Sequence, residues 1–233
     1  MAVDDTYTKA LLHMDGTDAS TTFTDESGKT WTAYGTAQID TAQSKFGGAS
    51  VLFDGNSDYI TTPDHADFAV GSGDFTIDFW FKKNANGALQ CAFCQLNSTA
   101  TLTTASILCY IDKTETNLPS IDVYAGGTLH GAQSATAITD TNWHHYAGVR
   151  NGNTLYLYID GIEKATHDLT GITINDSANV PTIGRPGDYN GQYTNGWIDE
   201  FRFSKGIARW TANFTPPTQP YGGGGQVIIW SSE

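Results

Sequence analysis

Hydrophobic and polar residues alternate with a period of two in several short runs of this chain. In DFTIDFWFKK (74–83), four apolar residues occupy every second position, and Thr, Asp, Trp and Lys stand between them. Similar runs occur at 49–55, 106–113, 120–127 and 197–203. Because successive side chains of a strand point to opposite faces, each run predicts a strand with one buried face and one wetter face.

Turn residues separate these runs at short intervals. The chain has 233 residues, of which 25 are glycine, and Thr, Asp and Asn are abundant. Many short strands joined by such turns favour an all-β protein, a two-sheet antiparallel jelly-roll sandwich, over a helical one. No run is long and apolar enough for a membrane span, so we expect no membrane insertion.

The stretch TNWHHYAGVRNGNTLYLYIDG (141–161) predicts a β-hairpin. A two-residue loop at 151–152 would place tyrosines opposite core residues on both faces. A three-residue loop at 151–153 pairs Val149 with Leu155 and gathers the apolar residues on one face. Because register is set by what becomes buried, we expect the three-residue loop.

This register assigns the two adjacent histidines to opposite faces. His145 falls on the core face, where we expect a hydrogen-bonded buried histidine. His144 falls on the outer face with Tyr146, Tyr156 and Tyr158, either as a solvated residue or as part of a binding face. Neighbouring strand residues point apart, so a regular strand does not let the pair bind one metal ion.

The outer-face aromatic residues are the candidate ligand contacts. Aromatic rings stack on sugar faces, and nearby polar groups bind hydroxyls. Alternatively these rings fill the groove or lie beneath loops, and the loops 184–196 and 97–104 then form the binding rim. The candidate ligand-binding residues are Trp80, Tyr124, His144, Tyr146, Tyr156 and Tyr158.

Charge and cysteine content argue against two classes of protein, nucleic-acid binders and proteins held by disulfides or zinc. The net charge is −13, and the 12 Lys and Arg residues are scattered, which argues against a nucleic-acid partner and fits either solubility or calcium binding. Cys91, Cys94 and Cys109 stand in strand-like surroundings, and we expect buried thiols rather than a disulfide framework or zinc site.

The two ends of the sequence carry further expectations. The start lacks the pattern of a secretory signal peptide. We predict a jelly roll over 1–221, a glycine linker at 222–225 and an apolar tail at 226–233. The tail is expected to dock on a partner by strand addition, to fold back as an edge strand, or to stay disordered. Its candidate docking residues are Val227, Ile228, Ile229 and Trp230.

Several motifs occur together in a characteristic order. They are LLHMDG, FGGASVLFDGNSDYI, GDFTIDFWFK, NWHHYAGVRNGNTLYLYIDG, IGRP and GWIDEFRFSKGIARWTANFTPPTQPY. Over about residues 9–221 this series resembles the laminin-G-like group of the concanavalin A-like lectin/glucanase superfamily. The resemblance implies binding of sugars or proteins. It also implies a phage or prophage structural protein, made in the host cytoplasm and released in the virion, with other virion proteins or further copies of itself as partners.

The resemblance also raises catalysis and calcium. Glucanases of this fold carry E-x-D-x-x-E on one strand, and this chain lacks that pattern. GxSxG, Walker and HExxH motifs are also absent from the sequence, so we expect no enzyme. Asp15, Asp54 and Asp199 match aspartates that recur in the family pattern. We expect Asp199, with Asp15 or oxygens near Asp54, to hold one structural Ca²⁺; the alternative is that these aspartates cap turns.

Three hypotheses follow. The favoured one is a non-enzymatic, lectin-like module on a virion, as a decoration, fibre or tail component that recognises glycan or a host surface. The second is a purely structural virion protein that docks through its C-terminal tail. The third, disfavoured by the carboxylate spacing, is a glycoside hydrolase.

Overall fold

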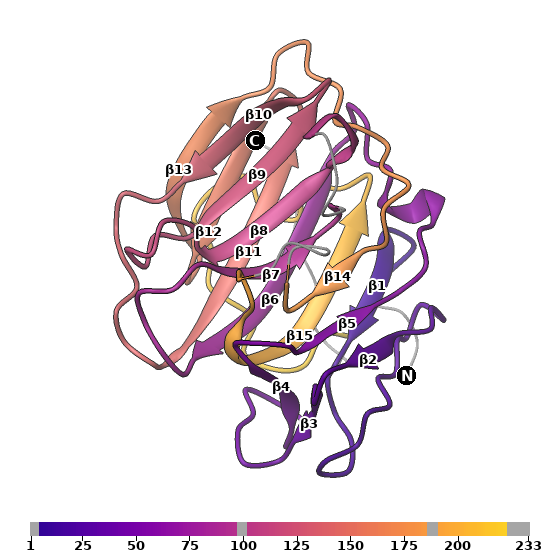
Figure 1. Ribbon diagram of the computed structural model, residues 1–233. Helices are drawn as coiled ribbons and strands as arrows, with labels where there is room; N and C mark the ends of the chain where they lie inside the picture. Colours follow the sequence, from indigo (N-terminus) through magenta and orange to yellow (C-terminus); the bar gives the residue numbers. More distant parts are fainter. Residues whose placement is uncertain (1–4, 97–101, 186–190, 223–233) are drawn as a thin grey trace.

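The computed structural model describes residues 5–96, 102–185 and 191–222, and their regular secondary structure is almost entirely β-strand. Two antiparallel sheets pack face to face (Figure 1). The predicted all-β, two-sheet sandwich is therefore confirmed. None of the helices in these ranges has the length and apolar character needed to cross a bilayer.

The first sheet has eight strands within the described ranges. Its order is β13-β12-β11-β6-β15-β4-β3, and β1 pairs with β15 as well. The strands are β1 (Thr8–Leu12), β3 (Gln38–Asp40), β4 (Ser50–Asp54), β6 (Phe75–Lys83), β11 (Trp143–Asn151), β12 (Thr154–Ile159), β13 (Ile162–Asp168) and β15 (Asn195–Lys205).

The second sheet has seven strands in the same ranges, in the order β10-β9-β8-β7-β14-β5-β2. The strands are β2 (Thr32–Tyr34), β5 (Tyr59–Thr61), β7 (Gln90–Cys94), β8 (Ile107–Asp112), β9 (Ser120–Ala125), β10 (Thr128–Gln133) and β14 (Thr182–Ile183). Two 3₁₀ turns, η1 (Ala66–Phe68) and η2 (Leu102–Thr104), stand in the connections.

The main core lies between the sheets and follows the predicted alternation. Phe75, Ile77, Phe79 and Phe81 of β6 are all fully buried in it. Burying one such side chain contributes about 1.5–3 kcal/mol relative to leaving it exposed. The three cysteines are free and buried, as expected, and burial raises the pKa of the Cys109 thiol.

A covering segment, residues 206–221, lies across the outer face of the eight-stranded sheet. Its Ala208, Trp210 and Phe214 pack with Ala147 and Tyr158 in a second apolar cluster. This sheet is therefore buried on both faces around β11 and β12. The prediction from alternating residues assumes instead that one face of each strand is exposed to solvent.

The predicted hairpin register is wrong. β11 and β12 pair Asn151 with Thr154 and Val149 with Tyr156, so the loop is the two-residue Gly152-Asn153. Gly152 has φ 56° at the first loop position, where a type II′ turn needs a left-handed residue. The predicted faces of β12 hold, but those of β11 are exchanged: Ala147 and Val149 lie with the outward-facing tyrosines of β12, and Tyr146 enters the main core.

A β-bulge interrupts β15. The pairing with β6 jumps between Asp199 and Arg202, and Glu200 has φ 52°. Before the bulge Asp199 lies opposite Trp80 on the outer face, and after it Phe201 and Phe203 enter the main core. The extra residue therefore changes which set of alternate residues faces the core: even-numbered before the bulge and odd-numbered after it.

Candidate ligand-binding site

Four side chains form a row on the outer face of the seven-stranded sheet, here called the tyrosine–arginine platform (Tyr34, Tyr59, Arg185 and Tyr193). The rings of Tyr34 and Tyr59 stack with centroids 4.6 Å apart and 3° between their planes. The guanidinium carbon of Arg185 lies 3.7 Å from the centre of the Tyr59 ring, close enough for a cation–π contact. Nη1 of Arg185 donates to the Tyr193 hydroxyl at 3.3 Å.

Strand pairing explains why these residues meet. β5 lies between β2 and β14, and Tyr34 is the direct cross-strand partner of Tyr59. Ile60 and Ile183 enter the main core, so Tyr59 points to the opposite, outer face. The ring of Tyr59 is thus held between Tyr34 and the guanidinium of Arg185.

A glycine brings Arg185 to this position. Gly184 has φ 100°, and a Cβ there would lie 2.7 Å from the ring of Phe53. Only glycine fits both the backbone conformation and the space. After β14 the backbone can therefore pack closely against the core at Gly184 and then place the side chain of Arg185 on the outer face.

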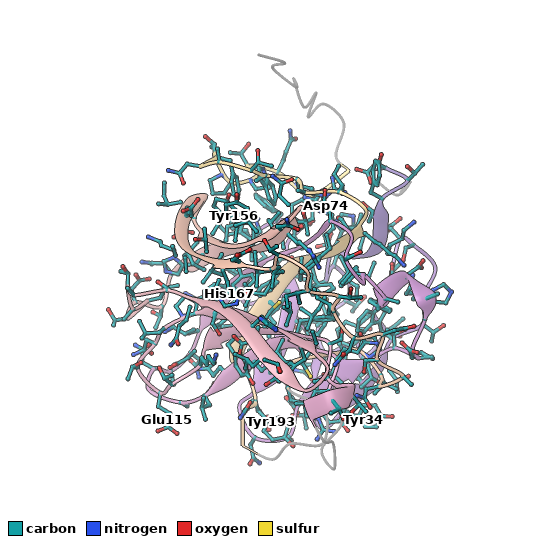
Figure 2. All side chains as sticks on the ribbon, turned by 90° about the horizontal axis from the view of Figure 1, so that it is seen from above. Tyr34, Asp74, Glu115, Tyr156, His167 and Tyr193 are labelled. Carbon is teal, nitrogen blue, oxygen red and sulfur yellow. The ribbon has the colours of Figure 1, made fainter. Side chains whose placement is uncertain are left out.

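The platform combines one exposed ring with a rigid support. Tyr34 is 44% exposed, Tyr59 and Tyr193 are partly buried, and Arg185 is almost buried. Figure 2 shows Tyr34 and Tyr193 on one side of the molecule and Tyr156 on the other. A planar, apolar ring beside phenolic and guanidinium hydrogen-bonding groups suits a ligand that has both apolar faces and hydroxyls.

The neighbouring part of the same face is closed. Tyr110 and Tyr124 pack there with Cys91, Cys94 and Leu108 in a buried apolar cluster. Burial raises the pKa of Tyr110, whose hydroxyl donates to the side chain of Gln192 at 3.2 Å. The candidate contact Tyr124 is 7% exposed and therefore fills this cluster.

The prediction that His144, Tyr146, Tyr156 and Tyr158 share one outer face is wrong. Tyr146 is fully buried in the main core, where it stacks on Phe79 with centroids 4.7 Å apart. Tyr156 and Tyr158 stack on each other on the opposite face. Tyr158 is fully buried there against the covering segment, and Tyr156 is partly exposed.

Trp80 lies on the outer face of β6, as predicted, but it is 5% exposed. The Nζ atom of Lys45 stands 3.7 Å from the centre of its ring, and the ring of His145 packs edge-on at 5.1 Å. Trp80 is therefore enclosed by neighbouring side chains, which leaves little of its ring to meet a ligand.

His145 is a buried histidine, as expected, but it lies outside the main core, beneath the covering segment. Its Nε2 is 3.1 Å from the Tyr221 hydroxyl and 3.7 Å from Asp78. Burial lowers the pKa of His145. Burial would raise the pKa of Asp78, but its ion pair with Arg202, at 3.0 Å, outweighs this and holds it well below its usual range.

His144 stands at the rim of the sheet between two carboxylates. Its Nδ1 lies 2.7 Å from Asp160 and its Nε2 lies 2.9 Å from Asp140. The hydrogen bond with Asp160 raises the pKa of His144 despite partial burial. This arrangement engages both ring nitrogens of His144 within the protein.

Asp15 and Asp199 come together beside one loop. The backbone N–H groups of Lys45 and Phe46 donate to Oδ2 of Asp199, and Gly47 packs directly against the Asp15 carboxylate. Oδ1 of Asp199 is buried without a hydrogen-bond partner. Burial raises the pKa of Asp199 to about 8, and the charges of Glu200 and Asp15 add to the effect.

This acidic pair fits a cation, because Ca²⁺ prefers carboxylate oxygens and the orphaned Oδ1 is an available ligand atom. Within the described ranges there is no group of three or more His, Cys, Asp or Glu side chains arranged for a metal. The remaining ligands would be backbone carbonyls and water. Asp54 differs, because its Oδ1 already accepts the N–H groups of Asn56, Ser57 and Asp58 as a turn cap.

The adjacent acids of β15 do not resemble a hydrolase pair. Asp199 and Glu200 are both fully buried. Glu200 is 2.9 Å from Nδ1 of His13 and accepts the N–H of Tyr221. Neither carboxyl group is placed to reach a glycosidic bond from solvent.

Some predicted positions lie outside the described residues. These are the tail residues Val227, Ile228, Ile229 and Trp230, most of the glycine linker, and parts of both candidate rim loops. The sequence did not single out Tyr34, Tyr59, Arg185 or Tyr193 individually. Its nearest signal was the loop 184–196, which contains two of them.

The two packed antiparallel sheets and their strand order define a concanavalin A-like sandwich. The Laminin_G_3 profile, described as "Concanavalin A-like lectin/glucanases superfamily", matches residues 54–209. The chain therefore belongs to this family, and the predicted resemblance is confirmed. A search of curated protein sequences finds no match.

Solved structures share the fold at low identity. One is domain 4 of AbnA, a GH43 extracellular arabinanase from Geobacillus stearothermophilus, in complex with arabinotriose (TM-score 0.65, 17% identity, 86% of this chain and 93% of that one). Another is the binding domain of Paraclostridial Mosquitocidal Protein 1 (TM-score 0.65, 15% identity, 86% and 49%). A third is the binding domain of Botulinum Neurotoxin DC with SialylT (TM-score 0.59, 14% identity, 88% and 49%). The chain thus spans about half of each toxin binding domain.

Proposed function

We propose that this protein is a non-catalytic, lectin-like carbohydrate-binding module whose ligand contact is the tyrosine–arginine platform. The observation that carries the proposal is the stacked and exposed ring of Tyr34. Tyr59 covers one side of that ring, so its exposed surface is the far face and the edge. A sugar can stack its C–H face there and direct hydroxyls to the neighbouring polar groups.

The support beneath Tyr34 favours recognition by a rigid surface. Tyr59 is fixed by the Tyr34 stack on one side and by Arg185 on the other. A contact that is already ordered loses little side-chain entropy when a ligand binds. The AbnA domain with arabinotriose and the neurotoxin domain with SialylT are sugar complexes on similar folds, which supports the choice of ligand class.

The absence of catalysis is part of the proposal. Asp199 and Glu200, the adjacent acids of β15, are buried and engaged by other groups. The sequence also lacks the glucanase pattern E-x-D-x-x-E. No observation of comparable weight supports a glycoside hydrolase function.

We also propose one structural Ca²⁺ at Asp15 and Asp199. The support is the buried, unpartnered Oδ1 of Asp199 beside a second carboxylate. The ion would neutralise the two negative charges and hold the loop that contains Lys45 and Phe46.

The biological setting is a third part of the proposal. We infer a virion surface protein, as a decoration, fibre or tail component, in which residues 226–233 dock on a neighbouring virion protein or a second copy. The support is the resemblance of the motif series to domains of phage structural proteins and the apolar sequence of the tail. Deletion of residues 222–233 should abolish incorporation into particles, and normal incorporation would contradict the docking role.

A glycan array tests the binding function. The wild-type chain should bind a restricted set of glycans, and Tyr34→Ala should weaken that binding about tenfold, since an aromatic contact contributes about 0.5–1.5 kcal/mol beyond area burial. Tyr7→Ala is the matched control, because Tyr7 is also 44% exposed but directly precedes β1 and is not part of the platform. A silent array, or equal binding by both variants, would contradict the platform as the site.

A further inference from the structure

His130 and His167 meet at one edge of the sandwich. They belong to β10 and β13, the edge strands of the two different sheets, which lie side by side there (Figure 1). Nε2 of His167 is 3.4 Å from Nδ1 of His130, and the rings are T-shaped with centroids 5.5 Å apart. Both residues are only partly buried, so small solutes reach them.

Strand parity explains why the two rings converge. His130 lies two positions from Ala132, which is buried in the main core. His167 lies two positions from Ala165, which packs against that core. Alternate residues of a strand share a face, so both histidines point towards the space between the sheets. They project from different sheets to one point at its rim.

The separation of the two nitrogens allows a long hydrogen bond and is also that of two ligands on one metal ion. Hydrogen bonds from N–H groups in proteins are most often about 2.9–3.0 Å long between heavy atoms. Two imidazole nitrogens on one tetrahedral ion, each about 2.0–2.1 Å from the metal, stand about 3.3–3.4 Å apart. The two imidazoles are therefore already spaced for shared ligation, and a metal ion would replace their long hydrogen bond.

We propose that His130 and His167 bind one divalent transition-metal ion, of the class of Zn²⁺, Ni²⁺ or Cu²⁺, which joins the edges of the two sheets. Neutral imidazole is a preferred ligand of these ions, whereas Ca²⁺ prefers oxygen, so this site differs in chemistry from the Asp15–Asp199 pair. Water completes the coordination, so the ion exchanges readily. Because the ligands come from two sheets, the ion binds the folded state and stabilises it.

Calorimetric titration of the full chain with Zn²⁺, in excess Ca²⁺, tests the site. The wild-type protein should bind one Zn²⁺ and show a higher melting temperature with it. His130→Ala and His167→Ala should each weaken binding at least tenfold and remove the thermal shift. His65→Ala is the matched control, because His65 is the N-cap residue of η1 and its side chain is 59% exposed. This variant should bind Zn²⁺ as the wild type does.

A cysteine variant keeps the test decisive if an alanine variant does not fold. His167→Cys retains a metal ligand, since thiolate binds Zn²⁺ and Co²⁺. Its Co²⁺ complex should show a thiolate charge-transfer absorption that the wild-type complex lacks. No zinc uptake by the wild type, uptake unchanged in folded alanine variants, or a cysteine variant without that absorption would overturn the proposal.

Discussion

The hydroxyl of Tyr221 lies 3.1 Å from Nε2 of His145 and ties the covering segment to β11. Both residues are buried, and the guanidinium carbon of Arg202 stands 4.0 Å from the centre of the Tyr221 ring. The N–H of Tyr221 also donates to Glu200. Tyr221, which directly precedes the four glycines at 222–225, is thus anchored through its ring, its hydroxyl and its backbone.

We predict that Tyr221 is a major source of stability. Tyr221→Phe leaves the buried Nε2 of His145 without its partner and should cost about 1–3 kcal/mol. Tyr221→Ala also empties the space of the ring and should cost about 3–5 kcal/mol. Urea unfolding measures both, with Tyr7→Phe as an exposed control that should change stability by less than about 0.5 kcal/mol. Equal stability of Tyr221→Ala and Tyr7→Ala would contradict the anchoring role.

A second prediction concerns pH. The hydrogen bond with Asp160 raises the pKa of His144 in the folded state. The folded protein therefore holds this proton more tightly than the unfolded chain does. The resulting stabilisation is fully present below the unfolded pKa of about 6.5 and is lost as the pH rises through the raised folded value.

Replacement of His144 isolates this effect. His144→Gln should lower the free energy of unfolding at pH 5.5 by up to about 1 kcal/mol more than at pH 8.5, a modest value because both carboxylate partners are half exposed. Chemical unfolding of both proteins across this range gives the difference. A variant whose deficit is the same at both pH values would show that the ion pairs contribute nothing.

The third prediction follows from the buried Asp199. Transfer from EDTA to Ca²⁺ should raise the melting temperature of the wild-type protein. Asp199→Asn removes a carboxylate ligand and should abolish that rise. In EDTA the same variant should be at least as stable as the wild type at pH 8.5, because burial of the charged carboxylate then no longer opposes folding.

Two results would argue against the ion. One is a wild-type melting temperature that is identical in EDTA and in Ca²⁺. The other is a calcium shift that persists in Asp199→Asn. Asp54→Asn serves as the comparison, because the Asp54 side chain caps a turn and the variant should retain the calcium response.

The sequence predicts those strands whose alternating apolar residues enter the main core. β6 alternates cleanly because Phe75, Ile77, Phe79 and Phe81 all enter that core. The sequence predicts the wrong register for the hairpin of β11 and β12, because the other face of this hairpin is also buried, under residues 206–221. Where both faces are apolar, the criterion of one buried face no longer selects a register.

The platform could not be predicted for a different reason. Tyr34 stands in a strand of three residues, which is too short for periodicity to be recognised. Tyr59, Arg185 and Tyr193 are far from it in sequence and meet it only through the order of β2, β5 and β14. Local patterns predict the faces of single strands, whereas a site assembled across strands depends on which strands become neighbours.

The bulge at Glu200 makes the length of β15 as important as its composition. If all these residues paired regularly, without the bulge, one half of the strand would turn over. Either Asp199 would then enter the apolar interior, or Phe201 and Phe203 would leave it. Deletion of Glu200 would instead make Asp199 and Phe201 adjacent and keep both on their present faces, with loss of the contacts that Glu200 makes with His13 and Tyr221. The extra residue therefore decides which side chains of β15 face the core.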